Sequence, residues 1–86
     1  MRAIQQPCEV THVTPRGTPK VIRWNDRTYH LTQELDRYRA GGRWWLGEPS
    51  RTCWVLQCGS VVLEVHHFDE TPGAHPQGWF IARMQD

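Results

Sequence analysis

Turn-forming residues divide this chain into short runs, and they constrain its fold more than any other feature. Seven Gly and six Pro are spread over 86 residues. Pro15-Arg16-Gly17 predicts a tight turn, because the fixed φ of proline suits the second position of a turn. Asn25-Asp26 predicts a hairpin tip, since both residues tolerate positive φ. Gly59-Ser60 predicts a two-residue turn of the Gly-X type.

The runs between these turns are rich in β-branched and aromatic residues, which favours strands. In the second half of the chain they also alternate: Val61, Leu63 and Val65 share one face of a strand, and Glu64 and His66 lie on the other. The strands expected from these patterns cover residues 9–14, 20–24, 27–33, 51–58, 61–68 and 79–84.

One segment fits two kinds of structure. Leu31, Leu35 and Tyr38 have the i, i+4, i+7 spacing of a helix. The same stretch also alternates from the hairpin tip onward, as a strand would. We favour a strand over residues 27–33, followed by a helical turn that ends near Arg39.

These elements predict a mainly-β fold with at most one short helix. The length of 86 residues fits one small domain that covers residues 1–86. Short strands joined by tight turns predict a small antiparallel meander. At this length it closes as a bent sheet or a partly open barrel of the SH3-like or OB-like kind.

Composition bounds the cellular setting. No segment approaches the roughly 18 apolar residues that span a membrane, and the start of the chain has no signal-peptide pattern. We therefore expect a cytoplasmic protein with no membrane partner. Three Cys, an odd number, argue against a disulfide framework.

Charge is distributed unevenly although the net charge is only +1. Residues 1–43 contain eight Lys or Arg against four Asp or Glu, whereas residues 44–86 contain two against five. Nine of the ten basic residues are Arg, the side chain suited to bidentate recognition and to stacking on aromatic rings. An Arg-rich composition is also what a GC-rich genome produces.

Basic and aromatic residues interleave in the first half of the chain, a pattern typical of single-strand binding, in which bases stack on aromatics and cations follow the backbone. Trp44 and Trp45 are adjacent, so in an extended segment one of them is exposed as a stacking platform. The residues expected to contact single-stranded or duplex DNA, or a partner, are Arg23, Arg27, Arg37, Arg39, Arg43 and Trp44.

A structural reading of the same residues stays open. In that reading the aromatics form the core and the Arg side chains lie over them. The core aromatics would then be Trp24, Tyr29, Trp54 and Trp79.

Metal and nucleophile chemistry are weaker alternatives. Cys53 and Cys58 are five residues apart on one expected strand, which separates them by about 16 Å and places them on opposite faces. That geometry is wrong for one zinc site. A reactive Cys needs an electropositive setting, and no local signature supplies one. We expect no metal, no cofactor and no enzymatic activity. Besides Cys53 and Cys58, the residues in the sequence that could act as metal ligands are Cys8, His12, His66, His67, Asp69, Glu70 and His75.

A protein interface is the remaining class. Trp, Tyr and Arg are enriched at interface hot spots, and a small β domain with a free edge can accept another strand. Association of two copies would also help a thin core. The alternative function is therefore a protein-interaction or homodimerisation module with no nucleic-acid contact.

The order of landmarks resembles a family of small uncharacterised bacterial domains, over residues 9–86. The landmarks are Val21-Ile22-Arg23-Trp24, Leu35-Asp36-Arg37-Tyr38, Gly42-Arg43-Trp44-Trp45 and the closing Gly78-Trp79-Phe80 strand. Similar segments occur at the C-terminal end of ImuB-type, Y-family polymerase-like proteins of mutagenic DNA repair. The resemblance implies a non-enzymatic accessory to DNA repair or translesion synthesis, with a repair polymerase-type protein as a partner.

Overall fold

The computed structural model describes residues 1–41, 50–68 and 78–86, and every regular element in these ranges is a strand. The mainly-β prediction is therefore confirmed. The strands are β1 (Arg2–Pro7), β2 (Glu9–Val13), β3 (Pro19–Trp24), β4 (Arg27–His30), β5 (Gln33–Ala40), β6 (Arg51–Cys58), β7 (Val61–Phe68) and β8 (Trp79–Gln85). No helix able to cross a membrane occurs in the described ranges.

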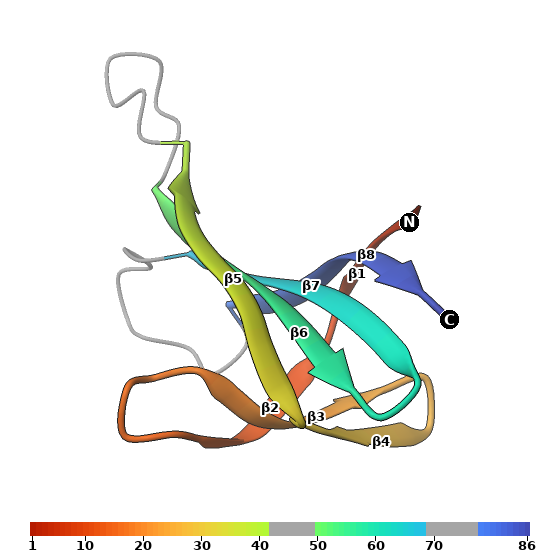
Figure 1. Ribbon diagram of the computed structural model, residues 1–86. Helices are drawn as coiled ribbons and strands as arrows, with labels where there is room; N and C mark the ends of the chain where they lie inside the picture. The colour runs from red at the N-terminus through yellow and green to blue at the C-terminus, as the bar shows by residue number, and fades with distance from the viewer. Residues whose placement is uncertain (42–49, 69–77) are drawn as a thin grey trace.

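The strands form two antiparallel sheets (Figure 1). The larger sheet has the strand order β1-β8-β7-β6-β5, and the smaller has the order β2-β3-β4. In the described residues the strands do not close into a barrel. The upper halves of β5 and β6 extend past the three-stranded sheet (Figure 1).

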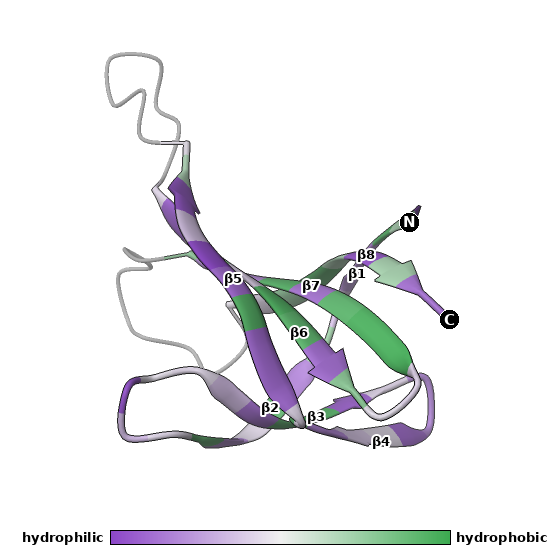
Figure 2. Ribbon diagram, in the orientation of Figure 1, coloured by the Kyte–Doolittle hydropathy of each residue, from purple (hydrophilic) through white to green (hydrophobic). Residues whose placement is uncertain are grey.

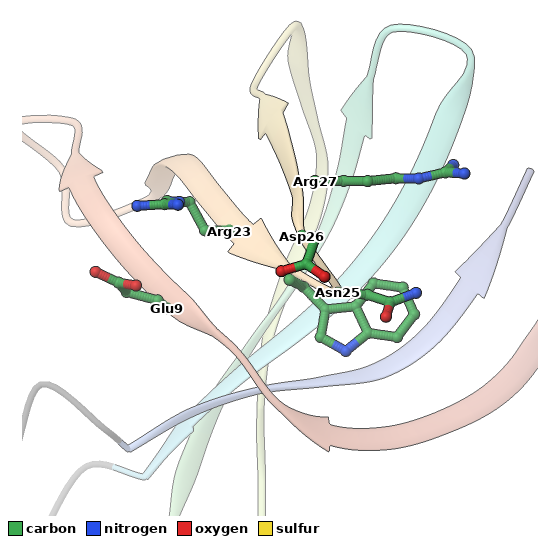
Figure 3. A pocket seen from close by; sticks show the side chains of 6 residues that line it. Glu9, Arg23, Asn25, Asp26 and Arg27 are labelled. Atoms are coloured by element: carbon green, nitrogen blue, oxygen red, sulfur yellow. The ribbon is translucent and has the colours of Figure 1, made fainter.

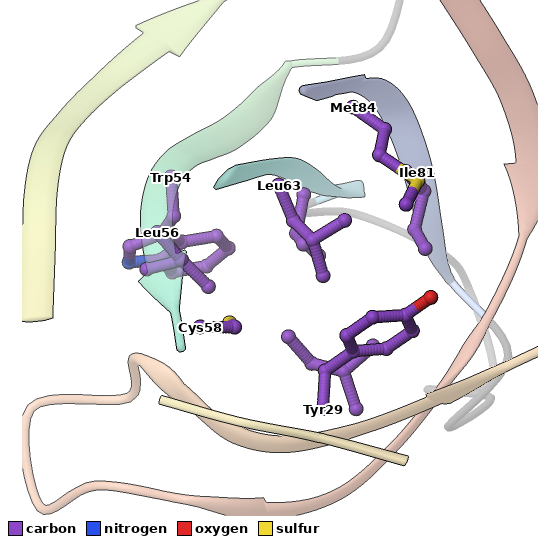
Figure 4. Close-up of a cluster of buried hydrophobic side chains, with 9 residues drawn as sticks. Tyr29, Trp54, Leu56, Cys58, Leu63, Ile81 and Met84 are labelled. Atoms are coloured by element: carbon purple, nitrogen blue, oxygen red, sulfur yellow. The ribbon is translucent and has the colours of Figure 1, made fainter. Parts of the chain in front are cut away.

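The core lies between the two sheets (Figure 4). The smaller sheet contributes Ile22 and Tyr29, and the larger sheet supplies the rest. The alternation of side chains along each strand explains which residues enter the core. Leu56, Leu63 and Ile81 lie on the same face of the larger sheet and are fully buried. Figure 2 shows the hydrophobic residues concentrated on β6 and β7, whereas much of β5 and of the β3–β4 hairpin is hydrophilic.

Turn chemistry fixes the hairpins as the sequence predicts. Asn25 and Asp26 have φ values of 53° and 61°, the conformation that a two-residue hairpin with two left-handed residues requires. Gly59 has a φ of 63° at the tip between β6 and β7. These two strands have the bounds that the sequence predicts.

The predicted helical turn up to Arg39 is wrong, because this segment is strand β5. The predicted strand over residues 27–33 is also interrupted: β4 ends at His30 and β5 begins at Gln33. The Leu31 amide donates to the Lys20 carbonyl at 2.9 Å, and the next amide, of Thr32, donates to the Gln57 carbonyl at 2.8 Å. The chain therefore passes from the smaller sheet to the larger one between these two residues.

A β-bulge explains the helix-like spacing. The register with β6 shifts between Glu34 and Asp36, so one residue of β5 has no direct partner there. The extra residue breaks the period of two, and Leu31, Leu35 and Tyr38 then show a helical spacing by coincidence.

Strand β1 is an element that the sequence patterns did not predict. It pairs with β8 and brings the two ends of the chain side by side (Figure 1). Arg2 and Asp86 form an exposed ion pair at 3.2 Å there. Its residues are almost all exposed, so they show no alternation of apolar and polar side chains.

Candidate nucleic-acid interface

Strand β5 places Arg37 and Arg39 on one face of the larger sheet. Residues directly opposite one another in antiparallel strands share a face. Arg39 lies in a row with Thr52, His67 and Trp79, running from β5 across β6 and β7 to β8. Arg37 begins the next row, whose second member is Trp54. Trp54 belongs to the core, so both rows lie on the core-facing side of the sheet. We call Arg37, Arg39, Trp54, His67 and Trp79 the β5 arginine–aromatic surface.

Four of these side chains form a chain of ring contacts. The Arg37 guanidinium carbon lies 5.6 Å from the ring centroid of Trp54. The Trp54 and Trp79 ring centroids are 5.3 Å apart, and those of Trp79 and His67 are 4.2 Å apart. Such contacts are attractive for a cation over an indole and for tilted aromatic pairs. The chain of contacts fixes the orientation of Trp79.

Exposure rises along this chain of rings. Trp54 is 4% exposed and anchors the surface to the core. His67 and Trp79 are only partly buried. Both belong to the Arg39 row, which lies next to the last pair of β5 and β6, Ala40 with Arg51. The outer members of the surface are therefore reachable from solvent.

The polar groups described on this surface are mainly N–H donors, from guanidinium and indole groups. Among the described strand residues, neither the Arg39 row nor the Arg37 row contains a carboxylate. Arg37 Nη1 donates to the Arg16 carbonyl oxygen at 3.3 Å, which holds the guanidinium in place. The buried Trp54 Nε1–H has no acceptor among the described residues, and Figure 4 shows this nitrogen on the side of β5. An anionic ligand suits such a set of groups.

Arg23 and Arg27 lie elsewhere, at the tip of the β3–β4 hairpin. Both line an open hollow of about 210 Å³, together with Glu9 and Asp26. Figure 3 shows the two guanidinium groups pointing in opposite directions. The register agrees, because Arg23 lies opposite Thr28 whereas Arg27 lies opposite Trp24, the next position of the strand. Two carboxylates offset the two cations in this hollow.

The six residues predicted from the sequence therefore do not form one described face. Arg37 and Arg39 are together on β5, and Arg23 and Arg27 line one hollow at the hairpin tip. Arg43 and Trp44 lie outside the described residues.

A buried ionisable cluster occupies the other face of the larger sheet. His66 Nε2–H donates to the Glu64 carboxylate at 2.9 Å, and both side chains are less than a tenth exposed. Arg83 Nε lies 3.8 Å from the same carboxylate. Burial lowers the pKa of His66, and the hydrogen bond to Glu64 opposes this shift. Desolvation raises the pKa of Tyr38 to about 12, with the Glu64 carboxylate adding to the rise.

The three thiols are poor candidates for nucleophiles. Burial raises the pKa of Cys8 to about 12 and that of Cys58 to about 11. Burial also raises the pKa of Cys53, which lies directly opposite His66. A thiol with a raised pKa stays protonated at neutral pH and reacts slowly.

Metal binding has little support in the described part of the chain. Cys58 packs in the core, and Cys53 lies in the row of Tyr38 on the opposite face of β6. Among the described residues, no group of three or more His, Cys, Asp or Glu is placed to hold a metal ion. Asp69, Glu70 and His75 lie outside the described residues.

His67 and Trp79 are site residues that the sequence reasoning did not select. Trp79 was assigned only to the core in the structural reading of the aromatics. A signal was nevertheless present: His67 continues the face of Leu63 and Val65, with the same period of two. A histidine at the end of an apolar face indicates where the core stops.

Comparisons of this chain with protein-family models, with curated proteins and with solved structures find no match. The resemblance to the C-terminal segment of ImuB-type proteins therefore stays a prediction.

Proposed function

We propose that this protein is a non-enzymatic cytoplasmic accessory module that contacts nucleic acid through the β5 arginine–aromatic surface. The observation that carries the proposal is the pairing of two Arg residues with partly exposed rings on one sheet face. Positive side chains that follow the backbone, beside aromatic side chains that stack on bases, are the usual components of a nucleic-acid groove.

The charge balance of the described surfaces supports this location over the hairpin tip. The hollow at the tip contains as many carboxylates as guanidinium groups. Within the described strands, the Arg37 and Arg39 rows contain two guanidinium groups and no carboxylate. Phosphate binding favours the second arrangement, because neutralising phosphates releases bound counterions.

The test compares two double variants with the same loss of charge. Arg37→Ala with Arg39→Ala removes the proposed contacts, and Arg23→Ala with Arg27→Ala is the matched control. Binding of a fluorescently labelled oligonucleotide is followed by anisotropy at several salt concentrations. We expect the wild type and the control to bind with similar salt slopes.

The β5 double variant should bind more weakly, with a salt slope smaller by about 1.4, because each lost phosphate contact removes about 0.7 from the slope for a single strand. Equal losses in the two double variants would contradict the location. Absence of any binding at low salt would contradict the function.

The proposed setting in DNA repair or translesion synthesis rests on the sequence resemblance alone. Its test is complex formation with a Y-family polymerase-like protein of mutagenic repair, measured by co-elution in size-exclusion chromatography. A retained complex that is lost in the β5 double variant would place the repair partner at the same surface. Separate elution at all concentrations would remove the repair setting from the proposal.

A free sheet edge supports a protein-interaction or homodimerisation module as the second candidate. Strand β5 ends the larger sheet and pairs only with β6 among the described strands. Leu35 and Tyr38 on this strand are 48% and 38% exposed. An extended segment could add to this edge. Analytical ultracentrifugation tests this candidate: association that hardly responds to salt favours it, and a monomer at all concentrations excludes self-association.

A further inference from the structure

We propose that the β5 arginine–aromatic surface selects single-stranded nucleic acid, by stacking an unpaired base on the Trp79–His67 pair. This inference rests on the proposed function and adds the class of ligand. It also assigns a binding role to two residues outside the predicted set, His67 and Trp79.

Contacts with His67 and with Trp54 hold the Trp79 ring in place. The two rings are tilted by 45° with centroids 4.2 Å apart. Behind them Trp54 holds Trp79 at 5.3 Å and is itself buried. A platform held in this way loses little side-chain freedom when a base stacks on it, which favours binding.

The partly exposed rings of this pair favour stacking with an unpaired base over contact with a double helix. His67 and Trp79 are partly exposed, whereas Trp54 is covered. Bases in the interior of a duplex are already stacked on both sides, so along a strand an aromatic ring can stack only on unpaired bases. A flat ring also accepts any base, which predicts little dependence on sequence.

The arginines are placed to hold the backbone beside such a base. Arg39 lies in the same cross-strand row as His67 and Trp79. Arg37 is two residues earlier on the same face of β5, which separates the two Cα atoms by about 6.6 Å. Because Arg37 lies over the Trp54 ring, its cation is fixed beside the aromatic platform.

The experiment distinguishes the contribution of the bases to binding from that of the phosphates. Its probes are oligo(dT), an abasic strand of the same length and a blunt duplex of the same length. The abasic strand keeps the phosphates and lacks the rings. Binding is measured for the wild type, for Trp79→Leu and for Trp24→Leu. Trp24 is the matched control, because it is a partly buried indole at the hairpin tip, bonded to Gln6 at 3.0 Å.

The expected result for the wild type is binding to oligo(dT) at least about five-fold tighter than to the abasic strand or to the duplex, since stacking contributes about 1–3 kcal/mol per base. Trp79→Leu should bind all three probes equally, with an unchanged salt slope. Trp24→Leu should keep the preference of the wild type. His67→Leu should weaken the preference while leaving Trp79 in place.

The possible failures are distinguishable. Equal wild-type affinity for oligo(dT) and the abasic strand would overturn base stacking and leave the proposed phosphate contact intact. A preference that Trp24→Leu removes and Trp79→Leu keeps would overturn the assigned platform. No binding of any probe at low salt would overturn both proposals. The wild-type comparison decides the first and the last of these without any variant, so a poorly folded Trp79→Leu protein does not block the test.

Discussion

His66 is buried on the face of the larger sheet that points away from the core. Its only described hydrogen bond joins Nε2 to the Glu64 carboxylate, and its Nδ1 atom has no partner among residues 1–41, 50–68 and 78–86. A neutral imidazole tolerates an unpaired acceptor nitrogen better than an imidazolium tolerates an unpaired N–H, because burying an unmatched charged donor costs more. The neighbouring cations Arg51 and Arg83 also disfavour a charged ring.

This arrangement predicts that acid destabilises the protein through His66. Its folded-state pKa is lowered, so between the ordinary pKa near 6.5 and the lower folded value the unfolded chain binds more protons. The stabilisation is complete above pH 6.5 and is lost as the pH falls through that window. Urea unfolding from about pH 8 to about pH 5 measures it. His66→Gln should show a shallower fall in the free energy of unfolding than the wild type.

His12→Gln is the matched control for this measurement, because His12 is an exposed histidine on β2. The control should follow the wild-type pH dependence. Parallel curves for His66→Gln and the wild type would contradict the account of the buried pair.

Individual residues on strand faces were predictable where apolar alternation was regular. Val61, Leu63 and Val65 share the core face of β7, as their spacing predicts. Glu64 and His66 lie on the other face, also as predicted. Their burial could not be foreseen, because it depends on Tyr38 and Phe80 from strands that are distant in sequence.

At the scale of elements, hairpins with clear turn residues were predicted best. Strands β6 and β7 keep their predicted bounds because Gly59-Ser60 fixes the register between them. The β5 prediction failed because the bulge between Glu34 and Asp36 interrupts the period of two. Strand β1 was missed because it is an exposed edge strand whose pairing with β8 joins opposite ends of the chain.

Both hairpin tips contain a left-handed position that favours glycine. We therefore expect that introducing glycine at one tip stabilises the protein and that removing it from the other destabilises it. Asp26 has a φ of 61°, where a side chain is strained, so Asp26→Gly should raise the free energy of unfolding by up to about 1 kcal/mol. At Gly59 the φ is 63°, and an added Cβ would meet no atom within 4 Å. Gly59→Ala therefore suffers only backbone strain and should lower the stability by about 1 kcal/mol.

Urea unfolding of both variants at one pH measures these changes. The opposite signs are the diagnostic result. A destabilised Asp26→Gly protein would mean that the Asp26 side chain supports the turn by more than its backbone strain costs.

At the scale of the whole molecule, the charge asymmetry of the sequence does not become one basic face. Residues 1–43 hold eight of the ten Lys and Arg residues, but those that lie on the described strands are divided between two sheets. The β3–β4 hairpin takes Arg23 and Arg27 to a site where Glu9 and Asp26 also lie. Strand β5 takes Arg37 and Arg39 to the larger sheet, beside aromatic rings from β6 and β8.

The candidate site was therefore predictable only in part. Interleaved Arg and aromatic residues pointed to nucleic acid and to Arg37 and Arg39. They could not indicate which rings would lie beside these cations. Trp79 and His67 reach the surface through pairing of β6, β7 and β8, which local sequence patterns do not specify.

The most direct measurement of the central claim is a two-dimensional ¹H–¹⁵N NMR titration of the wild-type protein with oligo(dT). The five Trp indole N–H groups give separate reporters across the molecule. We predict that the Trp79 and Trp54 indole signals and the backbone amides of Arg37 and Arg39 shift and saturate together, and that the Trp24 indole and the Arg27 amide stay in place. Shifts confined to the β3–β4 hairpin, or to Tyr38 and His66 on the opposite sheet face, would contradict it.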